Sequence, residues 1–190
     1  MTDKPAAPRS FAALRHPGAR AYLIGTALAM NADAVEHVIS YLIIWEKFQS
    51  PTLGGFAVVA HWLPFLFFSI HAGALADRFD PRRFFIASAL TAAAANALIL
   101  AFEPASFAVI GLRFATGVCM AGIYPVGLKL AASWARGNMG LMLGGLVGGL
   151  TLGSAAPHLF NALGGIDWVF TIAAASVSAT LAAVAMIWVE

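Results

Sequence analysis

Ionisable side chains recur at helical spacing within an apolar stretch close to residue 35. Asp33, Glu36, His37 and Ser40 fall within a sector of about 100° when successive helical residues are placed 100° apart. Carboxylates bind and release protons, and an imidazole titrates near neutral pH when nothing perturbs it. This pattern predicts a cluster that binds protons or orients a substrate.

A second apolar stretch carries Arg113 and, on the same helical face, Tyr124. Helical rise places Glu36 ~12–14 Å and Arg113 ~10 Å below the same edge of the apolar region. An ionised side chain near the centre of a membrane helix costs at least ~2.5–3.5 kcal/mol. We therefore expect Arg113 to pair with Glu36 or Asp33. The alternative is that these charged groups only hold the two helices together.

Other polar residues in the apolar stretches give weaker signals. For His61 and His71, near the ends of one stretch, we expect packing or interfacial contacts. Ser154 and His158 lie four residues apart, but no glycine-rich serine motif surrounds them, so a hydrolytic dyad is not expected. No spacing typical of metal ligands or phosphate-binding loops occurs. We predict no enzymatic activity, no catalytic residue, no metal site and no cofactor, with the proton as coupling ion.

The elements that carry these residues are six long apolar segments. Of the 190 residues, 61% are hydrophobic and 11% are charged, whereas soluble domains carry about 25% charged residues. Backbone groups in lipid must be satisfied within a helix, and ~20 residues cross a hydrocarbon core. The sequence thus predicts an all-α integral membrane protein. The net charge of +2 gives no reason to expect nucleic acid as a partner. The expected spans are 21–45, 55–74, 84–102, 107–129, 139–157 and 168–189.

Basic residues orient these spans, because cytoplasmic loops are enriched in lysine and arginine. Residues 1–20 are expected to form a cytoplasmic tail, residues 21–190 the membrane domain, and both termini to be cytoplasmic. Asp80 with Pro81, and Asp167, are expected to cap the third and sixth spans. Only Lys47 falls on the other side. The basic residues assigned to the cytoplasmic side are Lys4, Arg9, Arg15, Arg20, Arg78, Arg82, Arg83, Lys129 and Arg136.

Two motifs resemble signatures of the major facilitator superfamily. "GALADRFDPRR" is similar to the family's Gly-x-Leu-Ala-Asp-Arg-x-Gly-Arg-Arg loop between its second and third spans, with Asp80 where the family has glycine. "LRFATGVCMAG" resembles the fourth-span pattern of arginine, three residues and glycine, carried here by Arg113 and Gly117. Residues 36–83 are similar to a bacterial branch of drug and siderophore exporters. The loop residues that match are Gly73, Leu75, Asp77, Arg78, Arg82 and Arg83.

The resemblance implies a fold and a function. Six spans form one half of the family's transporter, built as a 3+3 inverted repeat. The expected activity is secondary transport of a small solute across the bacterial inner membrane, as proton-coupled export. The first and fourth spans of the family line a central cavity. The expected substrate and proton-coupling cavity therefore comprises Asp33, Glu36, His37, Ser40, Arg113 and Tyr124.

The same resemblance implies a conformational latch and a partner. The latch residues are expected to be Gly73, Asp77, Arg78, Arg82 and Arg83. We expect a homodimer or a separately encoded second half. In a homodimer, Asp77 of one copy is expected to dock at the start of the fifth span of the other, near Asn138, where the helix dipole attracts an anion. The alternative is a truncated or recombined family fragment that does not transport, or a membrane interaction partner.

Glycines dominate the fifth span. Two series repeat every four residues, which is the spacing that lets membrane helices approach closely. A helix-packing role is expected for these glycines and for Gly117. The series are Gly140, Gly144, Gly148 and Gly145, Gly149, Gly153.

Overall fold

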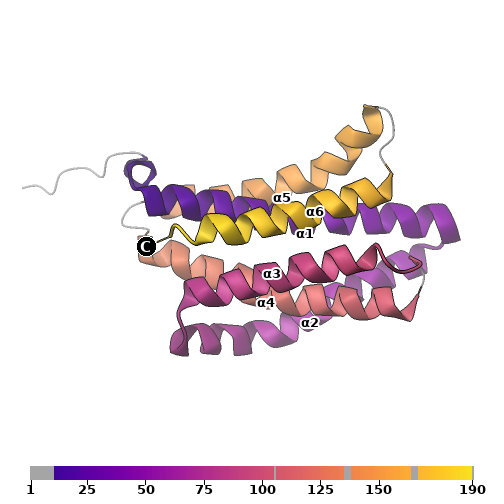
Figure 1. Cartoon of the computed structure of the whole chain (residues 1–190), viewed down its shortest axis with the longest axis horizontal. Helices are drawn as coiled ribbons and strands as arrows, with labels where there is room; N and C mark the ends of the chain where they lie inside the picture. The colour runs from indigo at the N-terminus through magenta and orange to yellow at the C-terminus, as the bar shows by residue number, and fades with distance from the viewer. Residues whose placement is uncertain (1–10, 105, 135–137, 164–166, 190) are drawn as a thin grey trace, which may run out of the picture.

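The computed structural model describes residues 11–104, 106–134, 138–163 and 167–189 (Figure 1). Residues 1–10 of the predicted tail, and Arg136, lie outside the described residues. The described part is helical and contains no strand. Its elements are η1 (Ala12–Arg15), α1 (Pro17–Phe48), α2 (Pro51–Arg78), α3 (Pro81–Ile99), α4 (Phe107–Trp134), α5 (Met139–Ala162) and α6 (Trp168–Met186).

The helices run side by side along the long axis and form two layers. One layer contains α5, α1 and α6, and the other contains α3, α4 and α2 (Figure 1). Within the layers, α1 packs against α5 and α6, while α4 packs against α2 and α3. Contact between α3 and α6 joins the layers along one side, whereas α1 touches α2 and α4 only sparsely. A seam therefore separates α1 from α2 and α4.

Five of the helices, α1, α2, α4, α5 and α6, are long and apolar enough to cross a membrane. The sixth, α3, has 19 residues, so every window of 18 residues in it includes both Arg82 and Arg83. Those two arginines lower its hydropathy below that of the other helices. Membrane crossing by α3, and hence the full set of six spans, stays a prediction.

The predicted helix caps are confirmed. Asp80 Oδ1 accepts hydrogen bonds from the backbone N–H groups of Arg82 (2.9 Å) and Arg83 (3.4 Å), and Pro81 occupies the first helical position. Asp167 Oδ1 accepts from Val169 N at 3.3 Å at the start of α6. Each cap satisfies N–H groups that the first helical turn leaves without partners.

The helix that carries the expected second span, 55–74, is longer than that span, because α2 runs from Pro51 to Arg78. Gly73 and Asp77 therefore lie on a helix, and only Phe79 and Asp80 separate α2 from α3. The family motif has a glycine where this chain has Asp80, and the short connection between α2 and α3 forms without that glycine. Asp80 instead caps α3, which begins at the next residue, Pro81.

Close approach of α5 to α1 depends on one glycine series. A Cβ on Gly149 would lie 2.5 Å from the carbonyl oxygen of Ala27, and one on Gly153 would lie 2.5 Å from that of Asn31. A Cβ on Gly145 would meet the side chain of Leu23 at 2.6 Å. Only a residue without a side chain allows the two backbones to come so close.

The second series does not pack within the described part of the chain, contrary to expectation. No atom comes within 4 Å of a Cβ placed on Gly140, Gly144 or Gly148. Adjacent helical positions point about 100° apart. The neighbour of a packed glycine therefore faces away from α1.

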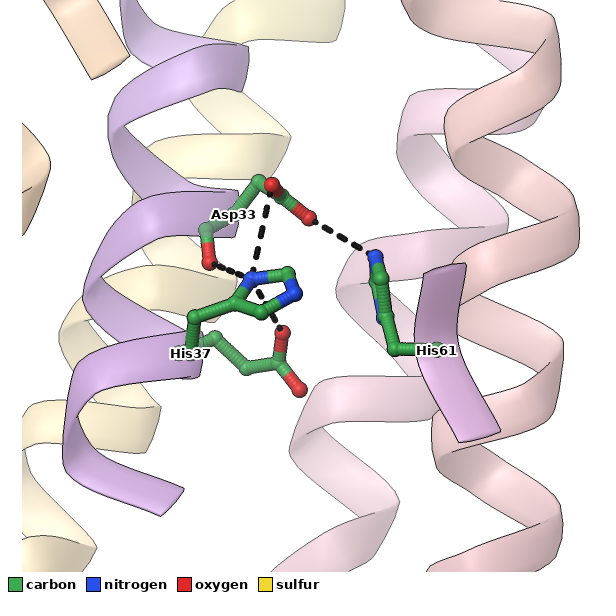
Figure 2. A group of neighbouring side chains, drawn as sticks. Asp33, His37 and His61 are labelled. Carbon is green, nitrogen blue, oxygen red and sulfur yellow. Dashed lines mark hydrogen bonds and ion pairs between the residues drawn. The ribbon is translucent and has the colours of Figure 1, made fainter. Parts of the chain in front are cut away.

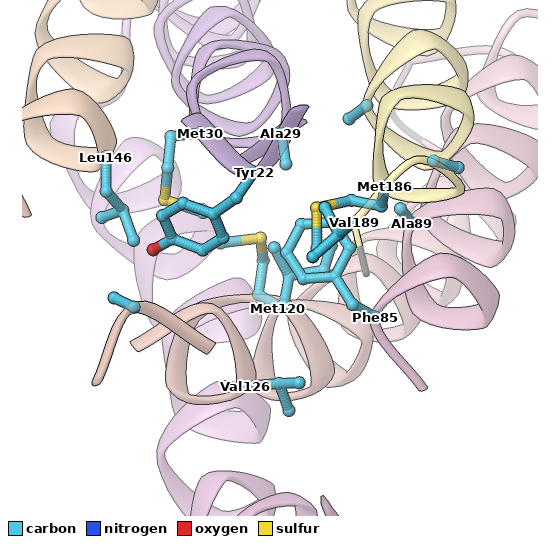
Figure 3. Packing of buried hydrophobic residues seen from close by; sticks show 14 of the residues in the cluster. Tyr22, Ala29, Met30, Phe85, Ala89, Met120, Val126, Leu146, Met186 and Val189 are labelled. Carbon is cyan, nitrogen blue, oxygen red and sulfur yellow. The ribbon is translucent and has the colours of Figure 1, made fainter. Parts of the chain in front are cut away.

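The apolar core occupies the half of the bundle that contains the start of α1 (Figure 3). Tyr22 and Phe85 are fully buried there among methionine and alanine side chains. The Tyr22 hydroxyl donates to the Gly127 carbonyl oxygen at 3.0 Å, which satisfies its polar end and ties α1 to α4. The seam is thus closed by apolar packing at this end of the bundle.

Candidate functional site

One face of α1 presents a row of buried polar groups, as the helical spacing predicted. Asp33, Glu36 and Ser40 are buried, and Glu36 is only 1% exposed. The His37 ring lies with Nδ1 2.7 Å from the Asp33 carbonyl oxygen one turn earlier. The Ser40 hydroxyl donates to the Glu36 carbonyl oxygen at 2.5 Å. These local bonds hold the polar side chains in place along the helix.

Arg113 approaches this row from α4. Its Nη1 forms an ion pair with Glu36 Oε1, and its Nη2 donates to the hydroxyl oxygen of Ser40. Glu36 is one of the two partners that the sequence predicted for Arg113. A buried charge is costly without a partner, so the pair removes a penalty from both helices. The contact crosses the seam between the two layers.

His61 on α2 completes the cluster, although the sequence predicted only packing or interfacial contact for it. The ring is 2% exposed, and its Nε2 lies 3.3 Å from Asp33 Oδ1 (Figure 2). Its centroid is 4.2 Å from that of His37, in an edge-to-face arrangement at 79°. His71, on the same helix, is exposed, with Nδ1 3.2 Å from the Phe67 carbonyl oxygen.

A glycine on α4 explains why His61 reaches the cluster. A Cβ on Gly117 would lie 2.2 Å from the His61 carbonyl oxygen and 2.8 Å from Pro64 Cγ. The packing role predicted for Gly117 thus appears as direct contact between α4 and α2. One residue earlier, Thr116 Oγ1 lies 3.3 Å from His61 Nδ1. No periodic pattern in α2 alone marked His61 for this position.

The cluster lies at the inner end of a cavity of about 280 Å³. Glu36, His37, His61 and Arg113 line its polar end. The remaining walls are mostly apolar, and they come from the same end of α1, α2, α4 and α6. These walls include Ile43, Ile44, Phe48, Leu53, Phe56, Ala57, Val109, Ile110, Trp168 and Ile172.

A second pocket, of about 20 Å³, adjoins the cluster on its other side. Asp33, Glu36, Thr116 and Asn96 contribute to its lining. Asn96 is 4% exposed, and its Oδ1 has no hydrogen-bond partner among the described residues. A space of this size holds about one water molecule. Asn96 was not among the residues that the sequence singled out.

Tyr124 does not join the cavity. Its ring packs edge-to-face on Phe65 with centroids 6.2 Å apart, beside the apolar core. The residue shares a helical face with Arg113 but lies about 16 Å further along α4 by helical rise. That distance places it beyond the inner end of the cavity.

The motif residues lie at the opposite end of the bundle from the cavity. Asp77 Oδ1 pairs with Lys129 Nζ of α4 at 2.5 Å, and Lys129 also donates to the Ala76 carbonyl oxygen at 2.6 Å. Arg82 donates to the Val189 carbonyl oxygen at 2.6 Å, which joins α3 to the end of α6. The latch role of these residues stays a prediction. The remaining motif positions are Gly73, with open space around it, exposed Arg78, and Arg83, whose Nε lies 3.6 Å from Asp80 Oδ2.

Comparison with known proteins identifies the family. The family model described as Major Facilitator Superfamily matches residues 22–190. Neither the comparison with curated proteins nor that with solved structures gives a match. The matched region contains α2 to α6, all of α1 after its first five residues, and both motifs. The chain therefore belongs to the Major Facilitator Superfamily, whose members are membrane transporters rather than typical enzymes.

Proposed function

We propose that the chain is the six-helix unit of a secondary transporter that exports a small solute in exchange for protons. In this proposal all six helices cross the bacterial inner membrane and both termini are cytoplasmic. The observation that carries it is the buried Glu36–Arg113 pair at the inner end of an otherwise apolar cavity. Ionisable groups persist at membrane depth mostly where they bind an ion or a substrate.

The position of the Glu36–Arg113 pair, between the two layers of helices, supports proton coupling. Glu36 belongs to the layer of α1, α5 and α6, whereas Arg113 belongs to that of α2, α3 and α4. Protonation of Glu36 removes the charge that attracts the guanidinium, so it weakens a contact across the seam. The layers stay joined through α3 and α6 and through the apolar core, whereas α1 touches α2 and α4 only sparsely, so loss of this pair would loosen the layers at the cavity. Binding of a proton to Glu36 would therefore change the width of the cavity.

The cavity favours a solute with an apolar body and a positive charge. Its walls are mostly apolar, and two carboxylates, those of Glu36 and Asp33, lie at or beside its inner end against the single guanidinium of Arg113, which leaves one negative charge in excess. A volume of about 280 Å³ is slightly below the usual range for ligand pockets. The transported solute is therefore small, or a second protein unit enlarges the site.

Two helices present the surfaces on which a second unit would pack. In the 18-residue apolar stretch of each helix that could cross a membrane, only 11% is buried for α2 and 22% for α5, against 44% for α1, α4 and α6. The exposed series Gly140, Gly144, Gly148 suits close approach of another helix. We propose a second six-helix unit there, either a second copy of this chain or a separately encoded half.

Gradient-driven flux tests the transport proposal. Purified protein in proteoliposomes, with an imposed pH gradient, is expected to move ethidium, a planar apolar cation, against its own gradient. Glu36→Gln is expected to abolish the dependence of flux on the pH gradient. Glu46→Gln is the matched control, because Glu46 is exposed on the same helix. Proton-coupled transport through Glu36 is contradicted if ethidium flux through the wild type does not depend on the pH gradient. It is also contradicted if the flux through Glu36→Gln depends on that gradient as it does in the wild type.

Crosslinking tests the partner proposal separately. The Asp77 side chain is 72% exposed beside Lys129, and Asn138 makes no side-chain cap at the start of α5. In a dimer we expect Asp77 of one copy to reach the α5 N-terminus of the other. Cysteines at positions 77 and 138 should then form a disulfide between copies in membranes. Absence of this product under both inward and outward pH gradients argues against that dimer.

A further inference from the structure

Four residues of the buried cluster have the side chains that bind transition metals. Asp33, Glu36, His37 and His61 each offer one ligand atom, and these atoms lie within 4.8 Å of one another. Asp33, Glu36 and His61 are at least nine-tenths buried. Imidazole nitrogens with carboxylate oxygens form a ligand set that suits zinc, cobalt, iron and manganese.

Neighbouring oxygens orient both imidazoles for metal binding. His37 Nδ1 lies 2.7 Å from the Asp33 carbonyl oxygen, which can only accept a hydrogen bond. The Thr116 hydroxyl donates to the Arg113 carbonyl oxygen at 2.8 Å, so its oxygen is left to accept from His61 Nδ1 at 3.3 Å. Both Nδ1 atoms therefore carry the proton, and both Nε2 atoms present lone pairs. Metal-binding histidines are held in the same way, with the second nitrogen donating to an oxygen.

In these tautomers both Nε2 atoms are acceptors, and Asp33 Oδ2 lies 3.5 Å from His37 Nδ1, which already donates to the Asp33 carbonyl oxygen. His37 Nε2, His61 Nε2 and Asp33 Oδ2 are buried without a hydrogen-bond partner among the described residues. Glu36 Oε1 meets only the guanidinium of Arg113. A buried acceptor without a partner costs ~1–3 kcal/mol. Several such atoms in one place indicate that a cation belongs among them.

The separations suit a shared metal ion. His61 Nε2 lies 3.3 Å from Asp33 Oδ1, although both atoms are acceptors in this arrangement. Two ligands with bonds of ~2.0–2.1 Å at a tetrahedral angle lie about 3.3–3.4 Å apart. In Figure 2 the Asp33 carboxylate is joined directly to the His61 ring, and the His37 ring lies beneath that carboxylate.

We propose that Asp33, His37 and His61, with Glu36 as a fourth ligand shared with Arg113, bind a divalent first-row transition metal ion. The carboxylates of Asp33 and Glu36 and the guanidinium of Arg113 together carry one negative charge. A divalent ion would change the net charge of the cluster to one positive charge. Arg113 therefore limits affinity and favours reversible binding. This inference goes beyond the proposed function, since a resident ion requires no transport.

Cobalt absorption tests the site directly. The chain is purified without a histidine tag, treated with a chelator and titrated with Co²⁺. A tetrahedral site gives intense visible absorption, whereas hydrated octahedral Co²⁺ absorbs weakly. The wild type is expected to show the intense bands, and Zn²⁺ is expected to abolish them. Only weak octahedral absorption in the wild type overturns the inference, and this reading needs no variant.

Variants locate the ion. His61→Ala and Asp33→Asn are expected to bind Co²⁺ at least about ten-fold more weakly, because even outer-shell changes cost that much. His71→Ala is the matched control on the same helix, and it should leave binding unchanged. Equal binding by His61→Ala, Asp33→Asn and His71→Ala places the metal elsewhere and contradicts the site. Ethidium flux without metal binding contradicts this inference alone.

Discussion

Replacing Gly117 by alanine tests whether contact between α2 and α4 positions the buried cluster. The new methyl group would lie 2.2 Å from the His61 carbonyl oxygen and 2.8 Å from Pro64 Cγ. Ordinary van der Waals contact begins at 3.4 Å, so α4 and α2 must separate locally by about 1.2 Å. The obstacle is backbone, which cannot rotate away as a flexible side chain does.

The expected cost combines two opposing effects. Overpacking a tight interface costs about 1–3 kcal/mol. Exchanging glycine for alanine in a helix returns up to about 1 kcal/mol. With that return, the free energy of unfolding should fall by up to about 2 kcal/mol relative to the wild type. Because His61 moves with α2, the 3.3 Å separation between His61 Nε2 and Asp33 Oδ1 should lengthen to roughly 4 Å, beyond the range of a direct polar contact.

The assay is unfolding of the purified protein in mixed micelles by SDS, followed by tryptophan fluorescence. Gly111→Ala is the matched control, because it lies on the same helix with no atom within 4 Å of the added methyl group. It should be as stable as the wild type or slightly more stable. Equal stability of Gly117→Ala and Gly111→Ala would refute the close approach of α4 to His61, and with it the reason given for the position of that ring.

Three further changes test other contacts. Arg113→Ala should lower the free energy of unfolding by about 3–5 kcal/mol, because it leaves Glu36 charged and buried without its partner. Adding Glu36→Gln should recover part of that loss, and a double variant no better than Arg113→Ala contradicts the ion pair. Gly149→Leu should destabilise the bundle strongly and Gly148→Leu should not, as measured by SDS unfolding, because only Gly149 meets the α1 backbone. Asp80→Ala should cost about 1 kcal/mol through the lost cap, whereas an unchanged midpoint would show that the cap contributes nothing.

Local rules were sufficient for features contained in one helix. The spacing of Asp33, Glu36 and Ser40 placed them on one face of α1, and the structure has them buried together. The N-cap formed by Asp80 was predicted from its position before Pro81. Depth along two apolar stretches predicted that Arg113 would need a carboxylate partner. Each of these depends only on helical geometry and on the cost of an unpaired charge.

Features that involve a second helix were harder to predict. His61 gave no periodic signal in α2, and its place beside Asp33 depends on the contact at Gly117. Tyr124 shares a helical face with Arg113, yet it packs in the apolar core because the cavity ends before it. A shared helical face predicts the direction in which a side chain points, but not how far along the bundle it lies. Depth depends on how far the neighbouring helices close the space.

The amino-acid sequence by itself determined the helices, their caps, the polar face of α1 and the membership of the Major Facilitator Superfamily. These follow from hydropathy, local hydrogen bonding and motifs that are each contained in one segment. Only the tertiary structure decided that His61 joins the cluster and that Gly149, rather than Gly148, faces α1. The rotation of a helix about its own axis is set by the surfaces it packs against. An apolar helix carries little information about that choice in its own sequence.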